Sequence, residues 1–293
     1  MTSAVNAAPT PEVVPVRPRR RFRPGLATVG GVIVALFVVM AVAPGLFSSQ
    51  STTALDVGQK LLPPSLDHLF GTDEVGRDIF SRVVHGARYT LSMSVAIVVV
   101  AAIIGTLLGL IAGYVGRWVD QLIMRITDVF FSLPTFVVAM SLAVVLGRGM
   151  LSLVFALSIV WWPTYTRLVR GMVLGIRERP HVRSAQAIGA GRIRILRHHI
   201  VPFLTHELIV RGTQDIGYAI VAVSSLSFIG VGAQPPSPEW GLVLSGARSY
   251  ITSSWAYPLF PGLTIIVATL GFSLLGDALS DRARPGSRRR GLS

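Results

Sequence analysis

Long apolar runs separated by polar segments dominate the pattern of this 293-residue chain. A helix needs about 20 mostly apolar residues to cross the hydrocarbon core of a bilayer. Six segments of the chain are long and apolar enough, so we expect an all-α membrane protein with six transmembrane helices. The predicted spans are Leu26 to Phe47, Tyr89 to Val115, Leu122 to Leu146, Leu151 to Leu174, Leu208 to Val231 and Pro258 to Ala278.

The amino-acid composition also indicates a membrane protein. Hydrophobic residues make up 51% of the chain and charged residues 14%, and the mean hydropathy is +0.61, which is too apolar for a soluble protein of this length. The chain has no cysteine, which excludes disulfides, thiolate nucleophiles and Cys-ligated metals. The 27 basic residues against 14 acidic ones suit a membrane surface, so we expect membrane lipid as a partner and no nucleic acid.

The basic residues also predict an orientation. Five arginines precede the first span, five follow the last and eight lie around the segment between the fourth and fifth spans, whereas the alternate loops are poorer in them. Excess Lys and Arg marks cytoplasmic segments. We therefore expect a multi-pass inner-membrane protein with both termini in the cytoplasm. The predicted parts are a cytoplasmic tail over 1–25, a first transmembrane helix over 26–47, an extracellular segment over 48–88, the main transmembrane domain over 89–280 and a basic tail over 281–293.

The first span has an alternative interpretation. Arginines before it and the triplet Ala41-Val42-Ala43 resemble a signal peptide with its cleavage site. Pro44 would follow the scissile bond, and cleavage would leave an odd number of spans. We therefore expect the span to be retained.

Small residues and prolines mark special positions within the spans. Gly105, Gly109 and Gly113 lie on one helix face, where they allow close helix packing, either within the chain or at a seam to a second subunit. Pro134 and Pro163 fall inside the third and fourth predicted spans, where each permits a kink.

Ionisable residues are expected near the ends of the spans. Arg125 can pair with Asp128, and Arg211 is expected to neutralise Asp215 four residues later. Asp277 lies near the end of the last span. An intramembrane hydrolase needs a base deep in the spans, and an ion-coupled secondary transporter needs midplane charges, so the pattern disfavours both while the second stays an alternative.

The basic segment 176–202 between the fourth and fifth spans is the clearest candidate for contact with a soluble partner. A short helix is predicted to begin after Pro180 and to end at residues 189–191. Val182, Ala185 and Ile188 would form an apolar ridge for docking into a partner's groove. The alternative is a lipid-facing surface that only enforces topology. The histidines of this segment lack metal-ligand spacing, so we expect no metal and no cofactor.

This segment resembles the cytoplasmic coupling motif of ABC importer permeases, usually Glu-Ala-Ala, then Gly after three residues, then His-x-Leu-Pro. Arg183, Ser184 and Ala185 occupy the triplet, Gly189 the glycine, and His199 to Pro202 the ending. The usual Glu and first Ala are thus replaced here. The residues expected to couple to an ATPase are Val182, Arg183, Ser184, Ala185, Ile188, Gly189, His199 and Pro202.

Three further regions are similar to the C-type permease subunit of dipeptide, oligopeptide and nickel importers. They are residues 71–88 before the second span, 226–241 after the fifth, and the Leu259-Phe260-Pro261-Gly262 and Leu275-Gly276-Asp277 motifs of the last span. Val223 stands where that subfamily often has an acidic residue, a second departure.

The resemblance implies a type I ABC importer permease fold with a permease domain over 89–280. It also implies a second homologous permease, two cytoplasmic ABC ATPases and an extracellular solute-binding protein as partners. The chain would be a non-catalytic permease subunit, since a phosphate loop needs a lysine and Lys60 is the only one. Its expected role is half of the translocation pathway for di- or oligopeptides, with nickel or another small solute as the alternative cargo.

Overall fold

The computed structural model describes residues 24–282, and the predicted tails lie largely outside this range. The described chain is helical, as expected from the sequence, with no strand. Its α-helices are α1 (Pro24–Val42), α2 (Ile79–Val115), α3 (Arg117–Ser132), α4 (Thr135–Val145), α5 (Met150–Arg177), α6 (Pro180–Ala187), α7 (Arg192–Ile195), α8 (Val201–Phe228), α9 (Trp240–Gly246) and α10 (Ala256–Arg282). The described chain also contains three short 3-10 turns, η1 (Pro44–Leu46), η2 (Val57–Gln59) and η4 (Ala247–Tyr250), and one π-turn, η3 (Leu196–Ile200).

Length and composition identify fewer membrane spans than the six predicted. Within residues 24–282, α1, α2 and α10 are each long and apolar enough to cross a membrane, and α3 with α4 adds a fourth if this pair is one bent span. α5 and α8 have 28 residues each but carry more polar side chains, including the Arg211–Asp215 pair of α8. A polar helix in a membrane protein usually faces the protein interior or a water-filled cavity.

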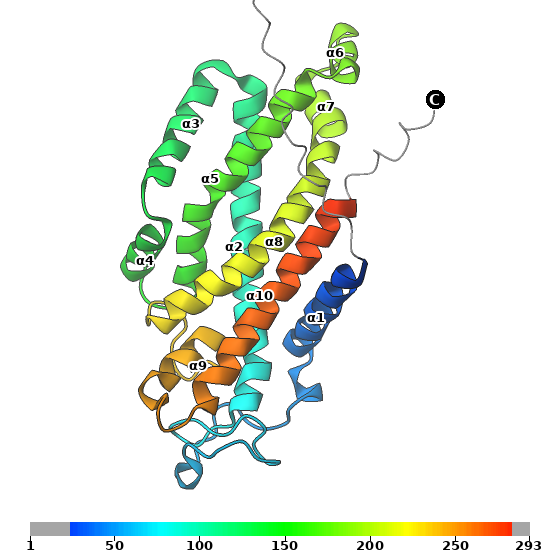
Figure 1. The fold of residues 1–293 in the computed structure, drawn as a ribbon. Helices are drawn as coiled ribbons and strands as arrows, with labels where there is room; N and C mark the ends of the chain where they lie inside the picture. The colour runs from blue at the N-terminus through cyan, green and yellow to red at the C-terminus, as the bar shows by residue number, and fades with distance from the viewer. Residues whose placement is uncertain (1–23, 283–293) are drawn as a thin grey trace, which may run out of the picture.

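The long helices lie side by side along one bundle axis (Figure 1). α1 packs against α10, where a Cβ atom on Gly271 would lie 2.4 Å from Ile33 Cγ2. The start of α1 and the end of α10 point toward the end of the bundle that carries α6 and α7, and α9 lies at the other end. The first helix is therefore an integral part of the described fold.

The glycine-rich face of α2 packs within the chain. A Cβ atom on Gly109 would lie 2.7 Å from the Thr166 carbonyl oxygen, and one on Gly113 would lie 2.8 Å from Val173 Cβ, both in α5. Missing side chains let the two backbones approach closely. The interpretation as packing within the chain is confirmed, and this face of α2 is not free to form a seam with a second subunit.

The two predicted proline kinks differ. At Pro134 the helix is interrupted between Ser132 and Thr135, and α3 and α4 are bent by 94°. Pro163 lies inside α5, which continues through it. The Pro134 break turns α4 away from the line of α3 and opens space beside α5.

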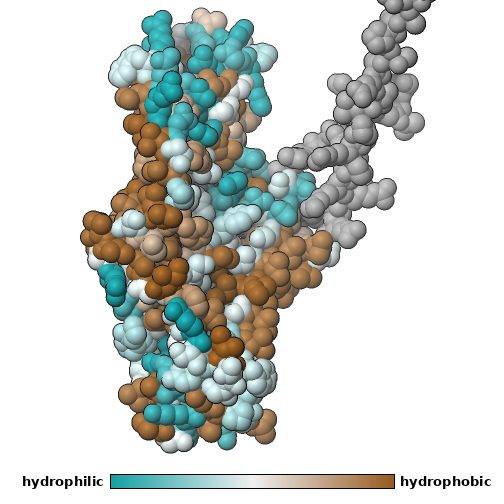
Figure 2. All heavy atoms as spheres, turned by 60° about the vertical axis from the view of Figure 1, so that its left-hand side comes forward, coloured by the Kyte–Doolittle hydropathy of each residue, from teal (hydrophilic) through white to brown (hydrophobic). Residues whose placement is uncertain are grey.

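The surface is that of a membrane protein. Large apolar side chains are exposed along α1, α2, α3, α4 and α10, for example Ile103, Leu107 and Val137. Figure 2 shows hydrophobic side chains over the middle of one face and hydrophilic ones gathered at its upper end. Such a wide exposed apolar area fits contact with lipid.

The segment before α2 is held by a buried charge cluster. Asp73 is fully buried, and its carboxylate accepts hydrogen bonds at 2.9 Å from the backbone N–H of Arg77 and at 2.6 Å from the Arg82 side chain. Asp78 caps the start of α2 by accepting from the Ser81 N–H at 2.6 Å. The motif over residues 71–82 is therefore a folded platform.

Candidate functional site

The connector, residues 178–200, joins α5 to α8 and contains α6, α7 and η3. It stands at one end of the bundle, where α5 ends and α8 begins (Figure 1). All eight residues predicted to couple to an ATPase lie in it or in the first turn of α8. The residues of the coupling motif are thus gathered at one end of the molecule.

α6 begins and ends where the sequence predicts. Pro180 occupies its first turn, where a missing backbone N–H costs nothing. At its end the Ala190 N–H donates to the Ala185 carbonyl and the Gly189 N–H to the Gln186 carbonyl, both at 3.0 Å. These two bonds form a Schellman motif, which needs a left-handed residue, and Gly189 has φ +81°.

The apolar ridge expected on α6 is not exposed, and this prediction was wrong. Val182 is fully buried and Ala185 is 7% exposed, because both pack toward the chain's own helices. Of the three ridge residues, only Ile188, 86% exposed, is available to a partner. The ridge was misassigned because a sequence pattern identifies the apolar face of a helix without identifying what covers it.

Val182 belongs to an apolar cluster that ties the connector to the helices on both sides of it. The members of this cluster are Val169, Val173 and Ile176 of α5, Val182 of α6, Ile195 of α7, Ile200 of η3 and Leu204 of α8. α6 is therefore packed directly against the end of α5 and the start of α8.

Arg183 pairs with Glu178, a residue that no sequence motif singled out. The guanidinium of Arg183 donates to the Glu178 carboxylate, and Arg177 Nε donates to it at 3.2 Å. Hydrogen bonds from Arg183 and Arg177 lower the pKa of Glu178. Arg183 thus replaces the family's usual acidic residue with a cation that has its own carboxylate partner.

The remaining predicted coupling residues lie around the start of α8. His199 is half-buried, with its ring 6.3 Å from that of His181, and Pro202 is exposed in the first turn of α8. Ser184 is exposed on α6. No group of three or more His, Asp or Glu side chains in the described part of the chain is arranged to hold a metal ion.

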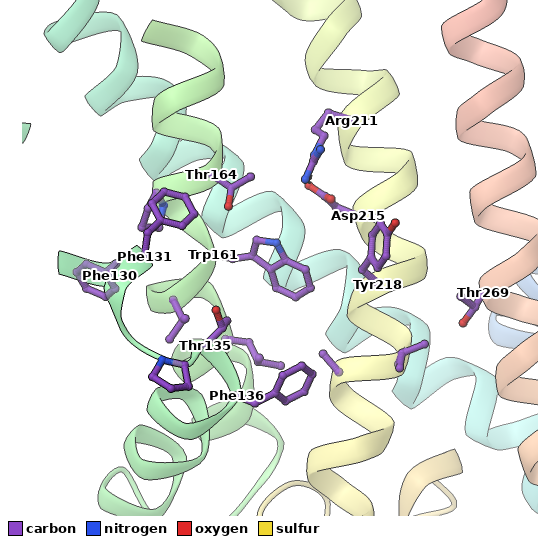
Figure 3. Close-up of a pocket in the computed structure, with 16 residues that line it drawn as sticks. Phe130, Phe131, Thr135, Phe136, Trp161, Thr164, Arg211, Asp215, Tyr218 and Thr269 are labelled. Atoms are coloured by element: carbon purple, nitrogen blue, oxygen red, sulfur yellow. Dashed lines mark hydrogen bonds and ion pairs between the residues drawn. The ribbon is translucent and has the colours of Figure 1, made fainter. Parts of the chain in front are cut away.

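A cavity of about 810 Å³ lies deeper in the bundle, between the α3–α4 break, α5 and α8. Figure 3 shows Trp161 and Thr164 of α5 facing Arg211 and Asp215 of α8, with Phe136 of α4 on the same side as Trp161. Its lining residues are Phe130, Phe131, Pro134, Thr135, Phe136, Leu157, Val160, Trp161, Pro163, Thr164, Arg211, Asp215, Tyr218, Val221, Ala222 and Thr269. No sequence pattern indicated this set, because its members come from separate segments of the chain.

Arg211 and Asp215 are the charged residues in this lining. Arg211 Nε donates to Asp215 Oδ2 at 3.0 Å, which confirms the expected i to i+4 pair. Asp215 is the fifteenth residue of the 28-residue α8 and is 1% exposed, so the expectation that it lies near a helix end was wrong. The helix begins at Val201, whereas the apolar pattern placed the start of the span at Leu208.

The second predicted ion pair, Arg125 with Asp128, is replaced by a pair between two helices. Asp128 pairs with Arg167 of α5 instead of Arg125, and Asp120 pairs with Arg170 of α5. Both pairs join α3 to α5, because the two helices are neighbours in the bundle. Val223, at the second departure from the subfamily, is fully buried in an apolar cluster between α5 and α8.

Comparison with known proteins identifies the family. Residues 105–289, more than half of the chain, match the family described as binding-protein-dependent transport system inner membrane component. The chain belongs to this family. Its members are permease subunits, and the class of function expected from the coupling motif is confirmed.

Curated relatives of this permease cover most of its length. It is 42% identical over 260 residues to the dipeptide transport system permease protein DppC of Alkalihalophilus pseudofirmus, covering 89% of this chain and 86% of the relative. It is 40% identical over 260 residues to the probable D,D-dipeptide transport system permease protein DdpC of Escherichia coli, covering 89% and 87%. It is 40% identical over 290 residues to a glutathione transport system permease protein GsiD of Escherichia coli, covering 97% and 96%.

Proposed function

We propose that this permease forms half of the translocation pathway of an ATP-driven ABC importer for peptides. It does no chemistry on its cargo, and partner subunits hydrolyse ATP. Six segments cross the inner membrane: α1, α2, the bent pair α3–α4, α5, α8 and α10. The connector and both termini are in the cytoplasm.

The observation that carries this proposal is the anchoring of the connector. Val182 and Ile195 are buried against α5 and α8, and those two helices line the cavity inside the bundle. Motion imposed on α6 by a soluble partner would therefore move the walls of the cavity. Such a device couples an external energy source to a change of access.

The proposed partners are a second homologous permease, two cytoplasmic ABC ATPases and an extracellular solute-binding protein. The family description names the transport system as dependent on a binding protein. The exposed surface offered to an ATPase is the outer side of α6, with Arg183, Ser184 and Ile188. We assign the type I importer arrangement and a permease domain over 89–280 on the same basis.

Peptide is the proposed cargo because the relatives are named for dipeptide, D,D-dipeptide and glutathione transport. These compounds share amide bonds and free carboxylates. The names favour peptide over nickel or another small solute. An ion-coupled transporter acting alone is disfavoured by membership of the binding-protein-dependent family.

The test uses the complete transporter, with both permeases, both ATPases and the binding protein, in liposomes. We expect uptake of labelled dipeptide that needs ATP and every partner. The variant Ile188→Asp should reduce co-purification of the ATPases and uptake together, because Ile188 has no packing role within the chain. Leu66→Asp, in the segment at the opposite end and 97% exposed, is the control and should retain the ATPases. Uptake driven by an ion gradient without ATP would overturn the proposal.

A further inference from the structure

We propose that the cavity between α4, α5 and α8 is a transit site in which Arg211 binds the free carboxylate of the peptide. This inference rests on the proposed function and assigns a substrate contact within the pathway. Three properties of the cavity carry it: an accessible guanidinium with unused donors, a buried carboxylate that orients it, and aromatic walls.

The guanidinium of Arg211 is only partly used by the protein. Its Nε donates to Asp215, whereas its two terminal nitrogens make no hydrogen bond to any residue in the range 24–282. The side chain is 39% exposed, in a cavity that is otherwise mostly apolar. Two parallel N–H donors of a guanidinium match the two oxygens of a carboxylate. A peptide carboxylate is therefore the ligand group that fits these donors.

Asp215 acts as a positioning residue. It is 1% exposed and lies one helical turn after Arg211 in the same helix, so its carboxylate holds the Nε side of the guanidinium and leaves the two terminal nitrogens of Arg211, which lines the cavity, unpaired among the described residues. Its negative charge also offsets part of the attraction between Arg211 and a bound carboxylate. A transport pathway needs such moderate affinity, because the cargo must leave as well as enter.

Aromatic side chains form the walls around this group. Trp161, Phe136 and Tyr218 line the cavity together with Phe130 and Phe131. Aromatic faces accept apolar side chains of many shapes. The cavity volume, about 810 Å³, falls within the usual range for small-molecule sites. A site that binds peptides of varied sequence is expected to fix the carboxylate by one contact and to surround the side chains with apolar surface of low specificity.

Depth in the bundle distinguishes a peptide carboxylate from a lipid headgroup. At 1.5 Å per residue, Asp215 lies about 20 Å along α8 from either end, and Arg211 lies about 15 Å from the start of the helix and about 25 Å from its end. A phospholipid headgroup remains at the membrane surface, whereas a transported solute must pass the middle. We therefore assign the site to the cargo.

The first experiment measures uptake of radiolabelled alanylphenylalanine by the complete transporter in liposomes. Arg211→Gln should reduce uptake about tenfold or more, as expected for loss of hydrogen bonds to a charged group, and Arg211→Lys should recover part of it. Arg125→Gln is the matched control, because Arg125 is exposed and has no ion pair among the described residues. Co-purification of all subunits shows that each variant assembles.

The charge exchange Arg211→Asp with Asp215→Arg separates substrate binding from a merely structural ion pair. An ion pair with a purely structural role is preserved when its two charges exchange positions. Restored uptake in the double variant would therefore overturn the inference. Continued loss of uptake in an assembled complex is the expected result, because the cation has moved into the buried position.

Photocrosslinking locates the contact directly. A benzoylphenylalanine at position 161 should crosslink to alanylphenylalanine during turnover, and one at the exposed position 118 should not. Arg211→Gln should abolish the crosslink. A crosslink from position 161 to the second permease alone would overturn the inference, because the partner would then fill the cavity. If the unmodified transporter takes up no alanylphenylalanine, the proposed function fails as well, whereas unchanged uptake in Arg211→Gln defeats this inference only.

Discussion

A Cβ atom on Gly105 of α2 would lie 2.4 Å from the Cβ atom of Tyr165 in α5, so the two helix backbones are in direct contact at this position. The Trp162 carbonyl oxygen is also within 2.6 Å of that point. Neither atom belongs to the flexible end of a side chain. The helix pair therefore has no means of absorbing an added methyl group except by separating.

Gly105→Ala should destabilise the permease by about 3 kcal/mol, the upper range for overpacking a tight interface. The measurement is thermal or denaturant unfolding of the purified complex. Gly171→Ala in α5 is the control, because a Cβ atom added there would have nothing within 4 Å and alanine favours a helix. A neutral effect of Gly105→Ala would mean that α2 and α5 are further apart than described.

Gly189→Ala should loosen the end of α6. Gly189 has φ +81°, and a left-handed backbone costs a non-glycine residue about 1 to 2 kcal/mol. We expect more ATP hydrolysed per peptide transported, because α6 would transmit motion less firmly. Gly191→Ala is the matched control two residues away, where φ is −64° and any residue fits. Equal coupling in the two variants would contradict this role for the Schellman motif.

Reversing the charge of Arg183 should weaken coupling several-fold, because Arg183→Glu places a second carboxylate beside Glu178. The double variant Glu178→Arg with Arg183→Glu should recover much of the loss. Arg192→Glu, at an exposed arginine without an ion pair in the described range, is the control. Failure of the exchange to recover coupling would show that Arg183 acts by another contact.

The ion pair of Glu178 with Arg183 also makes a prediction about pH. Hydrogen bonds from Arg183 and Arg177 lower the pKa of Glu178 in the folded protein. A lowered carboxyl pKa means that stabilisation is present above the ordinary pKa and is lost as the pH falls through the lowered value. Coupling should therefore not change through this pair across the neutral range. A loss of coupling between neutral and weakly acidic pH that Glu178→Gln abolishes would contradict this.

Asp73→Asn should destabilise the platform before α2 by about 3 kcal/mol, because removing one partner leaves the buried Arg82 without compensation. The asparagine keeps the shape and removes the charge. Limited proteolysis of residues 48–78 reports the platform directly. Asp67→Asn, at an exposed aspartate of the same segment, should leave proteolysis unchanged. Equal resistance in the two variants would show that the charge cluster is dispensable.

Reporter fusions test the orientation. Reporters at Arg290 and near Arg192 should both report the cytoplasm, and one near Gln50 should report the outside, since Lys and Arg are concentrated in cytoplasmic segments. A reporter near Arg192 on the outside would invert the proposed topology and remove the connector from any cytoplasmic ATPase.

Several structural features of this protein could be predicted from its sequence alone, because they depend on local interactions along the chain. Apolar runs predicted a helical membrane protein, Pro180 and Gly189 predicted the limits of α6, and the spacing from Gly189 to Pro202 indicated the permease family. Each of these depends on neighbours in the chain, namely backbone angles, helix length and motif order. Close packing at Gly105, Gly109 and Gly113 was also predicted, although the sequence left open which helix lies against them.

Only the tertiary structure decided which groups meet across the bundle. The sequence identified Val182 and Ala185 as an apolar face, but the fold decided that both are buried within the chain and that Val182 packs against α5 and α8. Asp128 had a candidate partner three residues away in Arg125, yet α5 brings Arg167 closer. The cavity around Arg211 combines side chains from α3, α4, α5, α8 and α10. Contacts between residues far apart in the chain depend on helix packing, which no local pattern encodes.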